Sequence, residues 1–120
     1  MFSTDNLKRG DVIRVRFDPT EGSEQSGERP ALVLSPELIN ARAPIILVAP
    51  LTTRKTERVY PFEALIEPLE GGLHQRSKVL LLHMRGIDKS RIIGRYGTLS
   101  DEVISRVDSA IRIATGLIQI

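Results

Sequence analysis

The apolar residues of this chain fall mostly into runs of five to seven residues, which are too short for long helices and rich in Val, Ile and Leu. The run at 11–17 alternates apolar residues with Arg14 and Arg16, the period of two expected of a half-buried strand. The runs at 31–35 and 45–50 are almost entirely apolar, which predicts strands buried on both faces. Three further strands are expected at 62–67, 78–83 and 91–97, with a turn at 70–72.

The C-terminal segment follows a different period. Its apolar residues recur at steps of three and four, which predicts one amphipathic helix, with the stripe Val103, Val107, Ala110, Ile111, Ala114 and Ile118. Ser100 is the expected N-cap, acidic residues follow it, and Gly116 is the expected end. Short strands followed by one such helix predict a small β-barrel or curled sheet that the helix seals.

The composition indicates one domain spanning residues 1–120, with the charge and apolar content of an ordinary globular protein. The chain has no cysteine, which excludes disulfides and thiolate metal sites and fits a cytoplasmic protein. No apolar stretch reaches membrane-span length, and the first ten residues lack the apolar core of a secretory signal. No zinc spacing, phosphate-binding glycine loop or Ser-His-Asp order is present, so these enzyme classes have no support.

Basic residues gather in one part of the sequence although the net charge is only +2. Residues 76–95 carry six Lys or Arg against one acid, a pattern that indicates either a polyanion-binding face or a solvated surface. Five aromatic residues are too few for a base-stacking platform. If the partner is a nucleic acid, phosphate contacts must therefore supply much of the affinity.

A polar connection of thirteen residues, 18–30, separates the first two expected strands. Pro19 restrains one end, and Pro30 forces Arg29 into an extended conformation at the other. Connections of this length without structure of their own are usually functional or disordered. Two interpretations stay open: the loop presents its polar residues to one ligand, or it is a surface loop that only faces water. The polar residues concerned are Ser23, Glu24, Gln25, Glu28 and Arg29.

Several blocks of the sequence together resemble the MazF/PemK family of toxin endoribonucleases. The first is FDPTEGSEQSGERPALVLSP, preceded by GDVIRV, and the others are VAPLTT (48–53), YPFEA (60–64), RGIDKSR (85–91) and GTLSDEVISRVDSAI (97–111). The resemblance covers nearly the whole chain from Gly10 onward. It implies a mainly β (α+β) fold, a small SH3-like antiparallel β-barrel of the PemK/CcdB type with a C-terminal amphipathic helix.

The resemblance also implies an activity and partners. The activity is sequence-specific cleavage of single-stranded RNA in the cytoplasm, without metal or cofactor. The protein is expected to form a homodimer and to be inhibited by a MazE-like antitoxin, and the toxin–antitoxin complex is expected to bind DNA. Attack by the RNA 2′-hydroxyl would leave a 2′,3′-cyclic phosphate and a 5′-hydroxyl.

The resemblance puts catalytic weight on Arg29 and Thr52. A guanidinium does not readily give up a proton, so Arg29 suits stabilisation of the phosphorane charge, and it acts as the acid only through a strongly coupled transfer. Thr52 is expected to donate to a phosphoryl oxygen and to orient the 2′-hydroxyl. Glu24 is a third candidate, either as proton acceptor or as a group that orients Arg29.

Further residues are expected to bind RNA, with Arg85 on a phosphate and Gln25 on a base edge. The basic segment 52–58 either grips flanking phosphates or is a solvated hairpin tip. The predicted RNA-binding set is Ser23, Gln25, Thr53, Arg54, Lys55, His83 and Arg85.

The sequence departs from the family pattern before Arg85. Leu82 stands where relatives commonly carry an acidic residue, and Gly86 replaces a threonine. His83 either supplies a titratable group or is a strand-end histidine near the RNA. The departure favours a rival interpretation: a non-catalytic toxin of the same fold that inhibits gyrase, or a regulator that binds only antitoxin or operator DNA.

Overall fold

The computed structural model describes residues 3–17 and 27–119. Seven strands, two α-helices and three short 3₁₀ helices are assigned within these residues. In chain order they are β1 (Asp11–Phe17), β2 (Gly27–Val33), α1 (Glu37–Arg42), β3 (Ile45–Thr52), β4 (Glu63–Ile66), η1 (Glu70–Gly72), β5 (Ser77–Leu80), η2 (Leu81–His83), β6 (Arg85–Asp88), η3 (Lys89–Arg91), β7 (Ile92–Thr98) and α2 (Asp101–Ala114).

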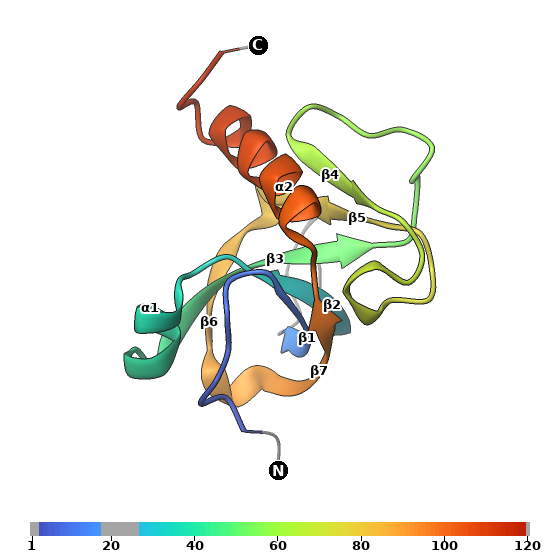
Figure 1. Ribbon diagram of the computed structural model, residues 1–120. Coiled ribbons are helices and arrows are strands. Elements are labelled where there is room, and N and C mark those ends of the chain that lie inside the picture. Colours follow the sequence, from blue (N-terminus) through green and yellow to red (C-terminus); the bar gives the residue numbers. More distant parts are fainter. Residues whose placement is uncertain (1–2, 18–26, 120) are drawn as a thin grey trace.

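The strands form one antiparallel sheet in the order β4-β5-β3-β2-β1-β7, with β6 paired to β3. β3 bridges the two halves, because its first part pairs with β6 and its end pairs with β5. Figure 1 shows the sheet curling beneath α2. No pairing joins β4 to β7 within the described residues, so the sheet is curled but does not close into a barrel. The predicted α+β class, an antiparallel sheet with a C-terminal helix, is confirmed.

Two apolar cores occupy the two faces of this sheet. One lies between the sheet and α2, where Val12, Leu32 and Leu51 meet the buried face of the helix. The second lies inside the curl and contains alternate residues of the same strands, such as Ile13 and Val33. Because successive side chains of a strand point to opposite faces, the apolar run at 31–34 serves both cores.

The helix α2 agrees closely with the sequence prediction. Ser100 accepts a hydrogen bond from the Val103 amide at the N-terminus, and acidic residues occupy the first turn. The helix ends at Ala114, and Gly116 follows with a φ of +78°. In the part of the chain that the structure describes, no helix is long and apolar enough to cross a bilayer.

Three local predictions need correction. The run at 78–83 is a strand only to Leu80, and a 3₁₀ turn takes over at 81–83. Ile45 and Leu47 are exposed rather than buried on both sides, because the outer core reaches β3 only at Ala49 and Leu51. The short elements α1 and β6 were not anticipated, since six and four residues are too few to show a period.

The turn at 70–72 is confirmed, and it gives a test of the fold. Gly72 has a φ of +79°, and a Cβ there would lie 2.1 Å from the backbone oxygen of Tyr96 in β7. We expect Gly72→Ala to lower the free energy of unfolding by about 3 kcal/mol, from backbone strain plus overpacking. Denaturant unfolding measures this. Gly116→Ala is the control, because φ is +78° but nothing lies within 4 Å, and we expect about 1 kcal/mol from the same strain alone. Equal losses in the two variants would contradict the close approach to β7.

Candidate active site

Three strands bring polar residues to one face of the sheet near the end of β3. Thr52, the last residue of β3, pairs directly with Lys78 of β5. On the other side, β2 pairs with β3 from Ala31–Pro50 to Val33–Val48, and Arg29 lies on β2 two residues before Ala31, where it pairs with Val15 of β1. Because cross-strand partners share a face, Thr52, Lys78 and Arg29 lie on the face that carries the inner core further along the strands. The site therefore lies where that core ends.

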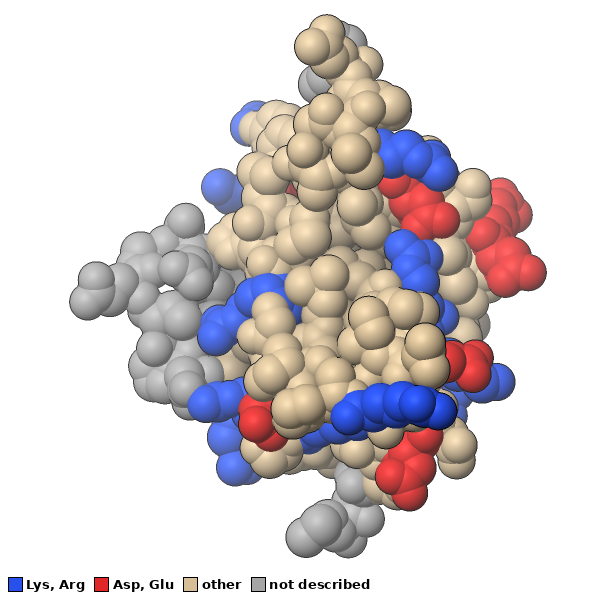
Figure 2. Space-filling model, turned by 90° about the vertical axis from the view of Figure 1, so that its left-hand side faces the viewer, with Lys and Arg blue, Asp and Glu red and all other residues tan. Residues whose placement is uncertain are grey.

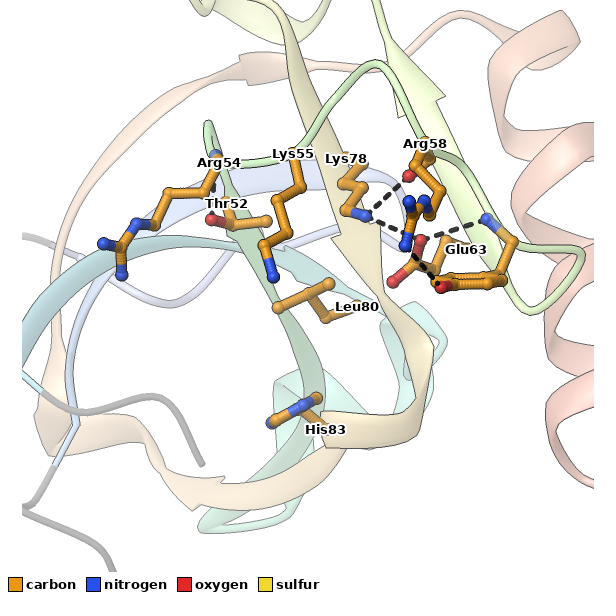
Figure 3. A pocket seen from close by; sticks show the side chains of 9 residues that line it. Thr52, Arg54, Lys55, Arg58, Glu63, Lys78, Leu80 and His83 are labelled. Carbon is orange, nitrogen blue, oxygen red and sulfur yellow. Dashed lines mark hydrogen bonds and ion pairs between the residues drawn. The ribbon is translucent and has the colours of Figure 1, made fainter. Parts of the chain in front are cut away.

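A pocket of about 500 Å³ opens beside Thr52, and we call it the Thr52 pocket. Figure 3 shows the side chains that line it, with basic groups on both sides of the Thr52 hydroxyl. The lining residues come from β3, from the loop between β3 and β4, from β4 and β5, and from η2. They are Thr52, Arg54, Lys55, Arg58, Tyr60, Glu63, Lys78, Leu80 and His83. Four cations against one carboxylate suit an anionic ligand.

The Thr52 side chain is 8% exposed and is held in place by its neighbour. Its Oγ1 accepts a hydrogen bond of 3.1 Å from the Arg54 amide. Because the hydroxyl is the acceptor in this hydrogen bond, its own proton is still available to donate to a ligand in the pocket. The arrangement makes Thr52 a donor toward a bound oxyanion.

The residue before Arg29 faces away from the site. Glu28 receives hydrogen bonds from Arg14 and Arg16 of β1, on the opposite face of the sheet. The hydrogen bond from Arg14, followed by that from Arg16, lowers the pKa of Glu28. One of the two interpretations of the 18–30 connection has Glu28 and Arg29 facing one ligand. The alternation of β2 instead places these two side chains on opposite faces of the sheet.

The loop between β3 and β4 carries most of the pocket's positive charge. Arg54, Lys55 and Arg58 all line the pocket, whereas Thr53 is exposed and lies outside the lining set. Arg58 donates a hydrogen bond to the Tyr60 hydroxyl, and this contact raises the pKa of Arg58. The Tyr60 ring stacks in parallel on that of Phe62, with centroids 5.4 Å apart.

Arg85 lies on β6, opposite Val48, and reaches the inner core. Its guanidinium is 5.4 Å from the centroid of the Phe17 ring. One terminal nitrogen, Nη1, is buried and has no hydrogen-bond partner among the described residues. Such an unsatisfied donor is unusual and suits an anionic ligand.

Other predicted residues divide into two groups. His83 lines the Thr52 pocket from η2, so the structure brings it together with Thr52, Arg54 and Lys55. The predicted site residues Ser23, Glu24 and Gln25 lie outside the described residues.

The basic run at 76–95 is partly compensated. Ion pairs within the described residues join Arg76 to Glu67, Lys78 to Glu63 and Arg95 to Asp11. The run therefore does not act as six unpaired charges, and the positive character of the site comes largely from the loop after β3.

Residues 8–115 match the family model of the PemK-like, MazF-like toxins of type II toxin–antitoxin systems. The chain belongs to this family. Over 112 residues it is 36% identical to Endoribonuclease EndoA of Bacillus subtilis (strain 168), covering 93% of this chain and 97% of that protein.

Solved structures of the family have the same fold. A crystal structure of MazF from Deinococcus radiodurans is 30% identical, with a TM-score of 0.78 over 92% of this chain and 97% of that one. A MazE–MazF complex from the same organism is 31% identical, with a TM-score of 0.71 over 93% and 97% of the two chains. The family resemblance drawn from the sequence is confirmed.

The structure shows the surroundings of Leu82 and Gly86, the two departures from the family pattern. Leu82 is 61% exposed, so the position of the missing acid lies on the surface. Gly86 pairs with Leu47, and a Cβ at Gly86 would lie 2.9 Å from Cγ2 of Ile45. A threonine at 86 would therefore require Ile45 to move.

Sequence reasoning missed three polar residues of this toxin's pocket, Tyr60, Glu63 and Lys78, whereas Arg58 lies in the basic segment 52–58 that was considered for phosphate binding. Lys78 is 4% exposed and pairs with Glu63. A lysine at the start of an apolar run and a glutamate at the start of the preceding strand were the available signal. Reading it required the β4–β5 register, which places Glu63 opposite Leu80 and Leu65 opposite Lys78.

Proposed function

We propose that this protein is an endoribonuclease toxin that cleaves single-stranded RNA at the Thr52 pocket. One observation carries the proposal: Thr52, the last residue of β3, lies in a pocket whose lining has four cations against one carboxylate. The relative named Endoribonuclease EndoA supports the activity. We further propose that residues 1–120 act as one domain, in the cytoplasm.

The reaction that suits these residues uses the RNA's own 2′-hydroxyl. The 2′-oxygen attacks the adjacent phosphorus and loses its proton, while the P–O5′ bond breaks and the 5′-oxygen gains a proton. The products are a 2′,3′-cyclic phosphate and a 5′-hydroxyl. Arg29 stabilises the extra negative charge of the phosphorane with its fork of donors, and Thr52 donates to a non-bridging oxygen.

The proton-transfer groups belong to this proposal as well. Glu24 is proposed as the acceptor of the 2′-hydroxyl proton or as a group that orients Arg29. His83 lies in the pocket lining and is a further candidate for proton transfer. The exposed Leu82 leaves no carboxylate at that position, so the mechanism does not use one there.

The flanking RNA is proposed to follow the positive charge. Arg54 and Lys55 contact phosphates next to the scissile one, and the positive charge of Arg85 acts on another. Ser23, Gln25 and Thr53 complete the proposed RNA contacts, with Gln25 on a base edge.

We propose a homodimer that a MazE-like antitoxin neutralises, as the MazE–MazF complex of Deinococcus radiodurans suggests. Apolar side chains are exposed on α1 and on the first half of β3: Leu38, Ile39, Ile45 and Leu47. Figure 2 shows the side of the molecule where α1 and β6 lie, with a broad area of uncharged residues and basic side chains around and across it. Such a surface suits a second protein chain.

A cleavage assay in excess EDTA tests the function. Purified protein incubated with a long single-stranded RNA is expected to give discrete fragments with 5′-hydroxyl ends. The fragments should disappear with Arg29→Ala. Intact RNA with the wild-type protein would contradict the proposal and favour the binding-only rival.

A further inference from the structure

We propose that Lys78 and Glu63 form a positioning pair that holds the β3–β4 loop (residues 53–62) in its RNA-binding conformation. The inference rests on the proposed function and adds two residues that act through the loop rather than on the RNA. Neither Lys78 nor Glu63 belongs to the catalytic and RNA-binding residues predicted from the sequence.

The pair ties the loop to the sheet at two points. The Lys78 ammonium donates a hydrogen bond of 2.8 Å to the Arg58 carbonyl, in the middle of the loop. It donates another of 2.8 Å to Oε1 of Glu63, and the same oxygen accepts the Tyr60 amide at 3.1 Å. Figure 3 shows these contacts converging at one wall of the pocket.

Both side chains are buried, at 6% exposure for Lys78 and 10% for Glu63. Buried charges of this kind are retained only when they are paired and hydrogen-bonded, so each partner depends on the other. The Tyr60 ring, 5.9 Å from the ammonium, closes this side of the pair. The hydrogen bonds of the Lys78 ammonium lead to the loop and to β4, which makes Lys78 a positioning residue rather than a catalytic one.

The loop needs such support because it joins β3 to β4 through ten residues without helix or strand. The hydrogen bonds that close its turns, Arg58 amide to Lys55 carbonyl and Glu63 amide to Tyr60 carbonyl, are local to it. Among the hydrogen bonds of the described residues, only the one from Lys78 to the Arg58 carbonyl connects the middle of the loop to β5. Ordering the loop before RNA arrives lowers the entropic cost of binding.

Loss of the pair should therefore weaken RNA binding and leave the bond-breaking step intact. We expect Lys78→Met to raise KM about tenfold, because losing the hydrogen bonds of the ammonium to the Arg58 carbonyl and to Glu63 lowers the population of the ordered loop. The value of kcat should stay within about twofold, because strand pairing holds Arg29 and Thr52. A merely structural role would instead lower the fraction of folded enzyme, and with it kcat, at an unchanged KM.

A second variant covers the case in which Lys78→Met leaves a buried carboxylate unpaired and fails to fold. Lys78→Met combined with Glu63→Gln removes both charges and keeps an acceptor for the Tyr60 amide. We expect the same rise in KM from this double variant. Thermal unfolding of each variant fixes an assay temperature at which all are folded.

Two control variants match these changes. Lys8→Met removes one positive charge at an exposed position outside the pocket lining. Glu67→Gln repeats the Glu63 substitution just beyond β4, where the carboxylate pairs with Arg76 at the surface. We expect KM to stay within about twofold of wild type for both, since exposed pairs contribute little.

Hydrogen exchange of the loop amides gives a readout that does not depend on cleavage. Faster exchange at 53–62 in the Lys78 variants, with the controls unchanged, supports the inference. Unchanged exchange, or a fall in kcat at constant KM, would overturn it. If the wild-type protein cleaves no RNA, the proposed function fails, and the exchange rates still decide whether the pair holds the loop.

Discussion

Arg29→Ala is expected to lower the rate constant of RNA cleavage by about 10³-fold, the cost of removing a donor aimed at transition-state charge. Arg29 lies on β2, two residues before the pairing of Ala31 with Pro50 of β3, and in the proposed mechanism its charge acts on the phosphorane more than on the ground-state phosphate. Single-turnover cleavage of a labelled RNA measures the effect. RNA affinity should change much less than the rate.

Two further variants sharpen this prediction. Arg29→Lys keeps the charge but loses the planar fork, so we expect a loss of about 10- to 100-fold. Arg14→Ala removes an arginine from the opposite face, where it contacts Glu28, and should leave the rate within about twofold of wild type. Equal losses at Arg14 and Arg29 would indicate a general charge effect and contradict a specific role for Arg29.

Thr52→Val is expected to lower the same rate constant by about 10²-fold, because it replaces the hydroxyl with a methyl group of similar size. The hydroxyl lies in the pocket and has its proton available, since Oγ1 already accepts the Arg54 amide. Thr52→Ser keeps the donor and should retain most of the activity.

Thr52→Val also removes an acceptor from the Arg54 amide, so its stability must be measured beside its activity. We expect a loss of about 1 kcal/mol, the net value of one hydrogen bond. A serine variant as slow as the valine variant would show that the methyl group, not the hydroxyl, carries the effect.

Much of the fold could be predicted from local patterns. Alternation located β1, and the three-and-four spacing with a serine cap located α2 to within a few residues. Local patterns gave less for β3, because its exposed residues Ile45 and Leu47 are as apolar as its buried ones. Whether a residue of β3 is buried depends on how distant elements pack against the strand, and the local sequence does not show this.

For the site, too, local sequence indicates some residues, whereas others depend on which strands pair. Arg29 and Thr52 were predicted from sequence blocks, and their catalytic roles stay predictions; Thr52 ends β3, and Arg29 lies near the start of β2. The pair of Lys78 and Glu63 was missed because its meaning depends on β5 lying between β3 and β4. A charged residue in a short apolar run reads as an edge or an exposed face until its cross-strand partner is known.

In the proposed mechanism, the side chains of Arg29 and Thr52 act on one phosphate. The most direct test is a structure of the protein bound to an RNA whose scissile nucleotide lacks the 2′-hydroxyl and therefore cannot be cut. The account predicts the Arg29 guanidinium and the Thr52 Oγ1 within about 3 Å of oxygens of that single phosphate. A scissile phosphate bound away from either side chain would contradict it.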